Sequence, residues 1–262
     1  MAKVILILGA GAGIGTAIGE KFANNGFHAC LARRSDEDGL KRSVDKITTN
    51  GGNASGFIVD ATASDQIEDL IDNIESKIGE IHTAVYNVGA QIGNRKLEDT
   101  SLKTFELGWK LGTFGLFRMA KTLLPKMVSR GSGNLLVTGA TASLRGNGGQ
   151  LSHASTMGAR RLLCQSLNAE FGRQGIHIAH IVIDGMVNAP DTLGKMLGEE
   201  AFEELKQQRG YGKNGILEPS AIADTYYHLA HQHPSAWTHE TELRPQTVLP
   251  WWNDMVIKEL DK

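Results

Sequence analysis

Short apolar runs alternate with longer stretches of helical periodicity along most of this chain, and this order restricts the fold more than any other feature. The apolar runs are rich in β-branched and aliphatic residues and lie at Val4–Leu8, Ala29–Ala32, Gly56–Val59, Thr83–Tyr86, Leu135–Thr138 and Ile176–Ile183. Helical periodicity appears between them at residues 14–25, 64–78, 102–128 and 152–171. Continuous apolar strands indicate a sheet buried on both faces, and strands alternating with helices give parallel βαβ units. We therefore expect a Rossmann-like, doubly wound parallel α/β fold.

Length, charge and cysteine content narrow the class of protein. A chain of 262 residues can form one α/β domain, so we assign residues 1–262 to a single domain. The formal net charge of -2 supplies no field for nucleic acid, and no apolar stretch approaches the ~20 residues that span a bilayer. Both cysteines, Cys30 and Cys164, lie in apolar runs, which is typical of reduced thiols. We expect a cytoplasmic protein that binds neither nucleic acid nor membranes.

The strongest local motif is a glycine-rich turn between the first strand and the first helix, with the sequence Gly9-Ala10-Gly11-Ala12-Gly13-Ile14-Gly15. Glycines there allow a tight turn and let backbone N–H groups approach a pyrophosphate. The spacing G-x-G-x-x-G is not met in any register, whereas G-x-x-x-G-x-G is met by Gly9, Gly13 and Gly15. Such a turn can be purely structural, but at the first strand of an α/β sheet it favours dinucleotide binding.

This pattern resembles that of the short-chain dehydrogenase/reductase family, and further matches follow in the family's order between about residues 3 and 240. Asp60 stands where the family holds the adenine, Tyr86-Asn87-Val88-Gly89 resembles its Asn-Asn-Ala-Gly turn, and Ile183-Asp184-Gly185 resembles its Pro-Gly turn. The resemblance implies an oxidoreductase of that fold. Together with the basic residues discussed next, it implies a dinucleotide site formed by Gly9, Gly11, Gly13, Ile14, Gly15, Arg33, Arg34, Asp60, Ala61, Asn87, Val88, Gly89, Asp184 and Gly185.

The end of the second strand bears on which nicotinamide dinucleotide is bound. An acidic residue there binds the adenine ribose hydroxyls, whereas a cation meets a 2′-phosphate. Ala32 stands where the acid is expected, and Arg33, followed by Arg34, is placed for a bidentate phosphate contact. Asp36 lies close enough to keep NAD(H) open as an alternative, although it also suits the start of the next helix. We predict NADP(H).

The resemblance fails at the catalytic positions. The family uses a Tyr, a Lys four residues later, a Ser upstream and an Asn on the preceding helix, and the matching positions here hold His153, Met157, Ala140 and Gly112. A hydroxyl could instead come from Thr138, Thr141, Ser143 or Ser152. Thr141 needs only a one-residue shift of the alignment. We take His153, Thr141 and Ser152 as the catalytic candidates.

The changes at His153 and Met157 have a common physical explanation. A tyrosine with a pKa of ~10 transfers protons poorly at neutral pH until an ammonium lowers that pKa, as the family's lysine does. A histidine with a pKa of ~6.5 needs no such help, and a nearby lysine would lower its pKa further. Met157 removes that charge, but also the lysine's hydrogen bonds to the nicotinamide ribose. His153 is therefore a candidate proton donor, and a pocket-lining residue without catalytic role is the equally weighted alternative.

Three functions fit these residues. The favoured one is an NADP(H)-dependent oxidoreductase that moves hydride between nicotinamide and a carbonyl or alcohol of a small molecule, with His153 as proton donor. The second is a non-catalytic dinucleotide-binding protein, either a redox sensor or an inactive subunit. The third uses His153 and Asp184 for acid–base isomerisation or dehydration. Fold alone decides none of them.

Two further expectations concern the substrate and the assembly. The alternation stops within about residues 185–215, where apolar residues stand among glycines and charges, and this segment is either a substrate lid or a plain helical insertion. As a lid it would suit a partly apolar substrate. The long helical stretches 102–128 and 152–171 match those that pair subunits in the family, with Leu162, Leu163 and Leu167 as an apolar stripe, so we expect a homodimer or homotetramer. The histidines near the C-terminus do not by themselves make a metal site, and we assign none.

Overall fold

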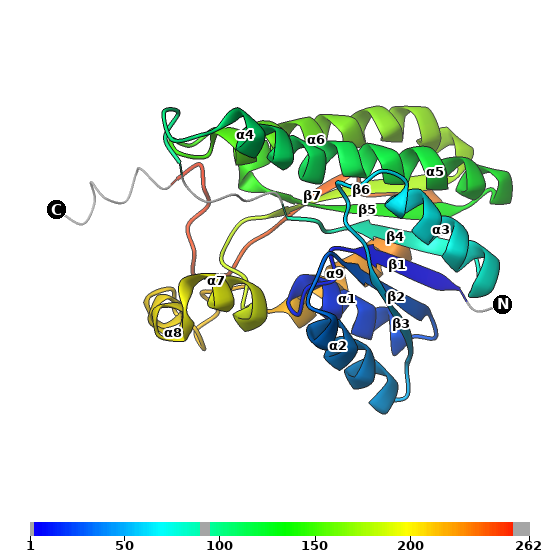
Figure 1. Cartoon of the computed structure of the whole chain (residues 1–262), viewed down its shortest axis with the longest axis horizontal. Coiled ribbons are helices and arrows are strands. Elements are labelled where there is room, and N and C mark those ends of the chain that lie inside the picture. Colours follow the sequence, from blue (N-terminus) through cyan, green and yellow to red (C-terminus); the bar gives the residue numbers. More distant parts are fainter. Residues whose placement is uncertain (1–2, 90–94, 254–262) are drawn as a thin grey trace.

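The computed structural model describes residues 3–89 and 95–253, whose strands form one seven-stranded sheet (Figure 1). The strands are β1 (Val4–Leu8), β2 (His28–Arg33), β3 (Asn53–Ile58), β4 (Ile81–Tyr86), β5 (Gly133–Ala140), β6 (Ile176–Ile183) and β7 (Glu240–Leu243). All neighbouring pairs are parallel, in the order β3-β2-β1-β4-β5-β6-β7. The strand order reverses between β1 and β4, and a ligand crevice forms at the carboxyl ends of such strands. The predicted doubly wound α/β fold is confirmed.

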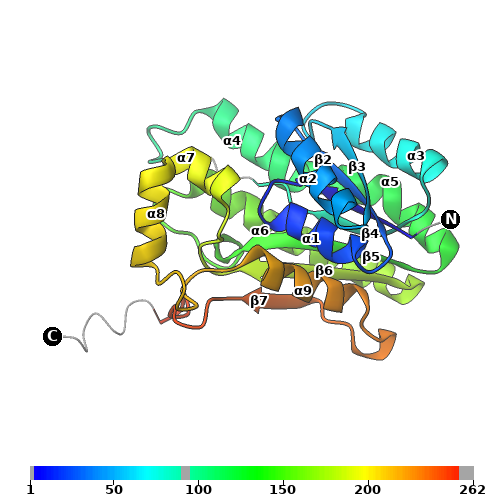
Figure 2. The same cartoon turned by 90° about the horizontal axis from the view of Figure 1, so that it is seen from below.

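Helices cover both faces of this sheet, as Figures 1 and 2 show. One face carries α3 (Gln66–Lys77), α4 (Leu102–Trp109), α5 (Gly115–Arg130) and α6 (Leu151–Phe171). The other face carries α1 (Ile14–Ala23), α2 (Glu37–Thr49) and α9 (Pro219–Ala230). Two short helices, α7 (Lys195–Leu197) and α8 (Glu199–Gln208), lie beyond the carboxyl ends of the strands. They belong to the segment in which the sequence lost its regular alternation.

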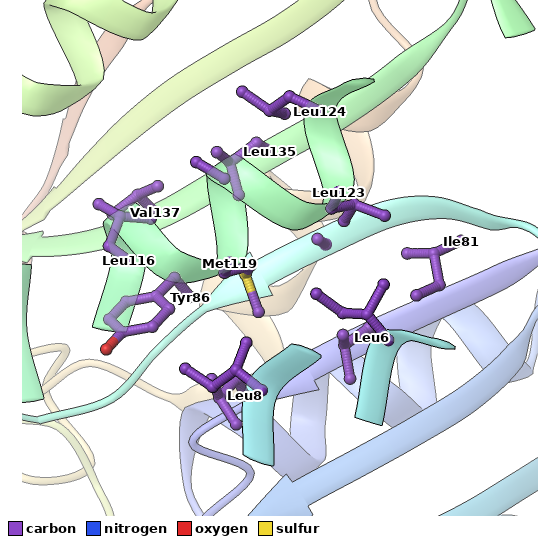
Figure 3. Packing of buried hydrophobic residues seen from close by; sticks show 14 of the residues in the cluster. Leu6, Leu8, Ile81, Tyr86, Leu116, Met119, Leu123, Leu124, Leu135 and Val137 are labelled. Carbon is purple, nitrogen blue, oxygen red and sulfur yellow. The ribbon is translucent and has the colours of Figure 1, made fainter. Parts of the chain in front are cut away.

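The central strand β1 supports an apolar core on each side of the sheet. All five of its residues are at most 1% exposed. Leu6 and Leu8 pack with Met119 and the other apolar side chains of α5 (Figure 3), whereas Ile5 and Ile7 face the layer of α1 and α9. Full burial of one such side chain contributes about 1.5–3 kcal/mol. The carboxyl end of β1 is therefore a firm support for the turn that follows it.

Three elements differ from the expectations. The helix expected over residues 102–128 is divided, because a π-helical segment, Lys110–Phe114, separates α4 from α5. β3 is an edge strand whose residues are exposed or only partly buried, so it is not one of the fully buried strands that its apolar residues suggested. β7 was missed because its sequence, Glu240–Leu243, contains no apolar run, and all its residues are half-buried.

Only part of the expected apolar stripe on α6 lies at the surface. Leu167 is buried and Leu163 packs against the protein's own core, whereas Leu162 is 60% exposed. A larger exposed apolar surface lies where α4 meets α5. There Trp109 and Phe114 are both exposed and stack with ring centroids 5.2 Å apart.

Residues 3–89 and 95–253 contain neither a membrane-spanning helix nor a cluster of metal ligands. No helix in this range is long and apolar enough to cross a bilayer. No group of three His, Cys, Asp or Glu side chains in the same range is placed to hold a metal ion. The C-terminal histidines make other contacts: His231 lies against the ring of Tyr227, and Nδ1 of His239 is 3.1 Å from the carbonyl oxygen of Ile178.

Candidate functional site

A cavity of about 1150 Å³ lies at the carboxyl ends of the strands. Its walls come from the turn after β1, the ends of β2, β4, β5 and β6, the first half of α6 and the segment around α7 and α8. Most small-molecule pockets measure ~300–1,000 Å³, so this cavity suits a ligand larger than one ordinary small molecule. The predicted dinucleotide residues that line it are Gly9, Gly11, Gly13, Ile14, Gly15, Arg33, Arg34, Ala61, Asn87, Val88, Gly89 and Gly185.

The glycine-rich turn fits closely against the end of β4. Gly9 has φ +94°, and a Cβ on it would lie 2.6 Å from the carbonyl carbon of Asn87. The side chain of Asn87 in turn donates from Nδ2 to the carbonyl oxygen of Gly9 over 2.8 Å. A Cβ on Gly15 would lie 2.6 Å from the Cα of Ala10, so this glycine lets α1 start directly beneath the turn. Because no side chain caps the start of α1, none competes there with a bound anion.

Hydrogen bonds link this turn through β4 and β5 to α9, which lies in the same helical layer as α1. Oγ1 of Thr138 on β5 donates to Oδ1 of Asn87 over 2.7 Å. The same Oγ1 lies 2.7 Å from the hydroxyl of Tyr226 on α9, and since the Thr138 proton is already used, Tyr226 is the donor. Tyr226 is completely buried, and burial raises its pKa. Thr138, considered above as a source of a catalytic hydroxyl, is thus engaged in supporting the turn.

Arg33 and Asp36 form a pair at the end of β2. Nη2 of Arg33 donates to Oδ2 of Asp36 over 3.1 Å, while its Nη1 is buried and has no hydrogen-bond partner among the described residues. Asp36 caps α2, accepting from the Gly39 amide at 3.0 Å. That hydrogen bond, followed by the charge of Arg33, lowers the pKa of Asp36. The carboxylate of Asp36 is therefore occupied, and Arg33, which lines the cavity, has N–H donors beyond the one given to Asp36.

Two predicted cofactor residues do not line the cavity themselves. Oδ1 of Asp60 accepts from the amide and the hydroxyl of Thr62, at 2.8 and 2.7 Å, and it is the neighbouring Ala61 that lines the wall. Asp184 is 8% exposed and lies 3.5 Å from Nη1 of Arg244. Burial, followed by the charge of Glu242, raises the pKa of Asp184. Both carboxylates therefore make their contacts within the protein, Asp60 with Thr62 and Asp184 with Arg244.

The catalytic candidates lie on and beside the first half of α6. His153 and Met157 both line the cavity, as do Ala140 and Thr141 at the end of β5. Ser152 is buried, and its Oγ has no hydrogen-bond partner among the described residues. It lines a separate small cavity beside His153. The structure therefore places His153 and Thr141 in the wall of the main cavity, whereas Ser152 does not line that cavity.

Arg160 lines the same cavity, and the sequence analysis missed it. Its side chain is 2% exposed, and each of its three nitrogens donates to a backbone carbonyl oxygen. Nε donates to Gly112 over 2.7 Å, Nη1 to Thr138 over 2.6 Å and Nη2 to Val88 over 2.8 Å. Gly112, which stands where the family has Asn, lies in the π-helical segment. The arginine thus joins that segment to the ends of β4 and β5.

The sequence did contain a signal for this arginine. Residues His153, Met157 and Arg160 have the spacing that places side chains on one face of a helix. With two of the three already assigned to the pocket, this spacing was enough to place the third beside them, but it was not used. The guanidinium also lies over the ring of Tyr86, 5.1 Å from its centroid.

The charged side chains around the cavity all have the same sign. Among the described residues no Asp or Glu lines it, and the charged side chains that do are Arg33, Arg34, Arg145, Arg160 and Arg209. A pocket with this charge distribution attracts anions. The phosphates of a dinucleotide are ligands of this kind.

The segment expected to be a lid lies at the edge of the cavity. Leu193, Leu205 and Arg209 line the cavity from this segment. A Cβ on Gly13 would lie 2.9 Å from the Cβ of Ala189, so the segment approaches the glycine-rich turn closely. Apolar side chains from this region give the cavity a partly apolar wall.

Comparison with known proteins places the chain among dehydrogenases. A family model described as short chain dehydrogenase matches residues 3–195. The 7α-hydroxysteroid dehydrogenase of Escherichia coli K12 is 27% identical over 222 residues, which cover 85% of this chain and 84% of that protein. A solved metagenomic short-chain oxidoreductase in complex with NADP has a TM-score of 0.76 at 20% identity, covering 93% of this chain and 97% of that one. A solved 7α-hydroxysteroid dehydrogenase complexed with NADH and 7-oxo glycochenodeoxycholic acid has a TM-score of 0.80 at 24% identity, covering 95% of each chain.

Proposed function

Because this chain belongs to the short-chain dehydrogenase family, whose members are oxidoreductases, we propose that it transfers hydride between NADP(H) and a carbonyl or alcohol group of a small molecule. The observation that carries this proposal is the composition of one cavity. The glycine-rich turn, the arginine at the end of β2 and a histidine on α6 all line it. Such a cavity can hold a dinucleotide and place a proton donor beside its far end.

The residues of the cavity fit NADP(H). The turn of Gly9 to Gly15 and the uncapped start of α1 would hold the pyrophosphate. Arg33, which lines the cavity and carries donors beyond the one given to Asp36, would hold the 2′-phosphate. NAD(H) is the alternative, and since one solved neighbour contains NADP and another NADH, the preference depends on Arg33. With the adenosine end at β2, the nicotinamide end would lie over β4 and β5, where the cofactor gives or accepts hydride.

His153 is the proposed proton donor for carbonyl reduction. It lines the cavity from α6, and Thr141 lines the same cavity from the turn after β5, where its hydroxyl would orient the carbonyl oxygen. Ser152, in the small cavity beside His153, is the other hydroxyl candidate near the imidazole. The donor must be an imidazolium, so reduction should slow as pH rises through the pKa of imidazole, ~6.5 in model peptides.

The test is oxidation of NADPH by the purified protein across a panel of ketones, aldehydes and keto esters. We expect absorbance of NADPH to fall with at least one carbonyl compound. The His153→Phe variant should bind NADPH as the wild type does and lose most of the rate. A wild-type protein that binds NADPH but turns over no carbonyl or alcohol would contradict hydride transfer.

We further propose that residues 1–262 form one domain, that the segment 185–215 acts as a substrate lid, and that the chain forms a homodimer or homotetramer. Leu193 and Leu205 in the cavity wall support a lid over a partly apolar substrate. The exposed aromatic residues Trp109 and Phe114, continued by Phe117 on α5, support subunit contact on this side, because exposed apolar patches mark interaction sites.

A further inference from the structure

Arg160 carries a buried positive charge without a carboxylate partner among the described residues. Its nitrogens all donate to backbone carbonyl oxygens, and the titratable groups that interact with it include Tyr86, Cys164, Tyr226 and His180. Glu240 on β7 is bound instead by Arg161, at 2.6 and 2.8 Å, and by His180 at 3.0 Å. Removing a charge from water is costly, and a carboxylate partner usually offsets that cost. The charge of Arg160 therefore acts on whatever occupies the cavity.

The position of Arg160 identifies which end of the cavity it affects. It holds the carbonyl groups of Val88 after β4 and Thr138 on β5, whereas Arg33 stands at the end of β2. In the strand order β2 and β4 flank β1 on opposite sides. With the adenosine end at Arg33, an assignment that rests on the proposed function, the nicotinamide end extends toward Arg160.

We propose that Arg160 sets the preference of the site between the two redox states of the dinucleotide. The oxidised nicotinamide ring carries a positive charge, and the reduced ring is neutral. A buried guanidinium fixed by three hydrogen bonds repels the oxidised ring and leaves the reduced ring unaffected, so the site binds NADPH more tightly than NADP⁺. The same charge opposes hydride donation by the bound cofactor. This preference favours binding of NADPH before the reaction and dissociation of NADP⁺ after it.

The preference can be measured by calorimetry without any substrate. Kd is determined for NADPH, NADP⁺ and 2′-phospho-ADP-ribose, which lacks nicotinamide, with the wild type, Arg160→Met, Arg160→Lys and Arg161→Met. Unit charges within ~10 Å at an effective dielectric constant of ~30 change affinity by about six-fold. We expect the wild-type ratio of Kd for NADP⁺ to Kd for NADPH to be about six or more and to fall toward one in Arg160→Met. Arg160→Lys keeps the charge and should keep the ratio.

The controls separate this charge effect from loss of structure. Arg161→Met removes the neighbouring arginine, which binds Glu240 and does not line the cavity, and should leave the ratio unchanged. Affinity for 2′-phospho-ADP-ribose reports the effect of Arg160→Met on the phosphates alone, and it should change by the same factor as affinity for NADPH. If circular dichroism shows that Arg160→Met is unfolded, Arg160→Gln replaces it, and if that too is unfolded the wild-type ratio decides.

Two results would overturn the proposal: equal wild-type affinity for NADPH and NADP⁺, or a ratio that folded Arg160→Met leaves unchanged. A wild type that binds 2′-phospho-ADP-ribose but binds NADPH and NADP⁺ with equal affinity refutes only the role of Arg160 and leaves the proposed function standing. A wild type that binds none of the three ligands refutes the proposed function, and the role of Arg160 with it.

Discussion

Replacing Arg33 with alanine should move the cofactor preference from NADPH toward NADH. The Arg33 side chain is 15% exposed, one Nη binds Asp36 and the other has no partner among the described residues. A charge-assisted hydrogen bond contributes ~1.5–3 kcal/mol, and every 1.4 kcal/mol is ten-fold in affinity. We therefore expect NADPH to bind about ten- to a hundred-fold more weakly to Arg33→Ala, with NADH nearly unchanged. The lost pair with Asp36 is partly exposed, and exposed ion pairs contribute little to stability, so the variant should fold.

A second variant, in which Asp36 is changed, tests the ion pair of Arg33 and Asp36 from the side of the carboxylate. Asp36→Asn keeps a good N-cap for α2, where the side chain accepts from Gly39, but it removes the charge that holds Arg33. NADPH should then bind more tightly, because a phosphate no longer competes with a carboxylate for Arg33. Arg42→Ala is the matched control: Arg42 is an exposed arginine on α2 that also acts on Asp36 electrostatically, and it does not line the cavity.

Isothermal titration of both cofactors at one ionic strength is the assay, because salt weakens charge contacts. Equal losses for NADPH and NADH in Arg33→Ala would refute the assignment of Arg33 to the 2′-phosphate. A selective loss of NADH affinity in Asp36→Asn would show instead that Asp36 binds the ribose hydroxyls of NAD(H).

Other predictions concern catalysis, stability and assembly. His153→Phe should lower the reduction rate ~10²–10⁴-fold in steady-state assays, since the general acid is lost, and an undiminished rate would place proton transfer elsewhere. Burial lowers the pKa of His82 to about 4, so the unfolded state binds more protons below pH ~6.5 and the free energy of unfolding should fall from pH 6.5 toward 4. Urea unfolding should show that His82→Gln flattens this slope. Gly9→Ala should destabilise by more than about 2 kcal/mol in the same assay, because φ +94° and the nearby Asn87 backbone oppose a Cβ. Phe114→Glu should reduce the assembled mass in light scattering, and a wild-type monomer would contradict the proposed oligomer.

Sequence periodicity predicted the strands well where burial is complete. The bounds of β1 and β6 agree with the predicted Val4–Leu8 and Ile176–Ile183, because every residue of β1 and nearly every residue of β6 is buried. It failed for β7, whose half-buried polar residues carry no apolar period. Periodicity also failed to predict the π-helical break at Lys110–Phe114, because one extra residue in a helical turn changes the spacing of apolar residues very little.

The candidate site was predicted from the backbone motif better than from the polar side chains. Most residues of the glycine-rich turn line the cavity as expected, because their role depends on local geometry. Arg160 escaped notice because its hydrogen-bond acceptors are backbone carbonyls far apart in sequence. The occupied state of Asp36 depends on a left-handed φ of 66°, which the sequence does not reveal. Long-range pairing of this kind appears only in three dimensions.

The hydrogen bonds that run from Gly9 through Asn87 and Thr138 to Tyr226 bear on how the protein is made. The ribosome releases the glycine-rich turn first and its last support, Tyr226, some two hundred residues later. α1, which starts at that turn, packs on α9, the helix that carries Tyr226. Contacts so distant in sequence form slowly, and a nascent chain exposes its unpaired strands until they do. The dinucleotide site can therefore reach its final shape only near the end of translation, and until then the strands of the emerging N-terminal half lack their final partners.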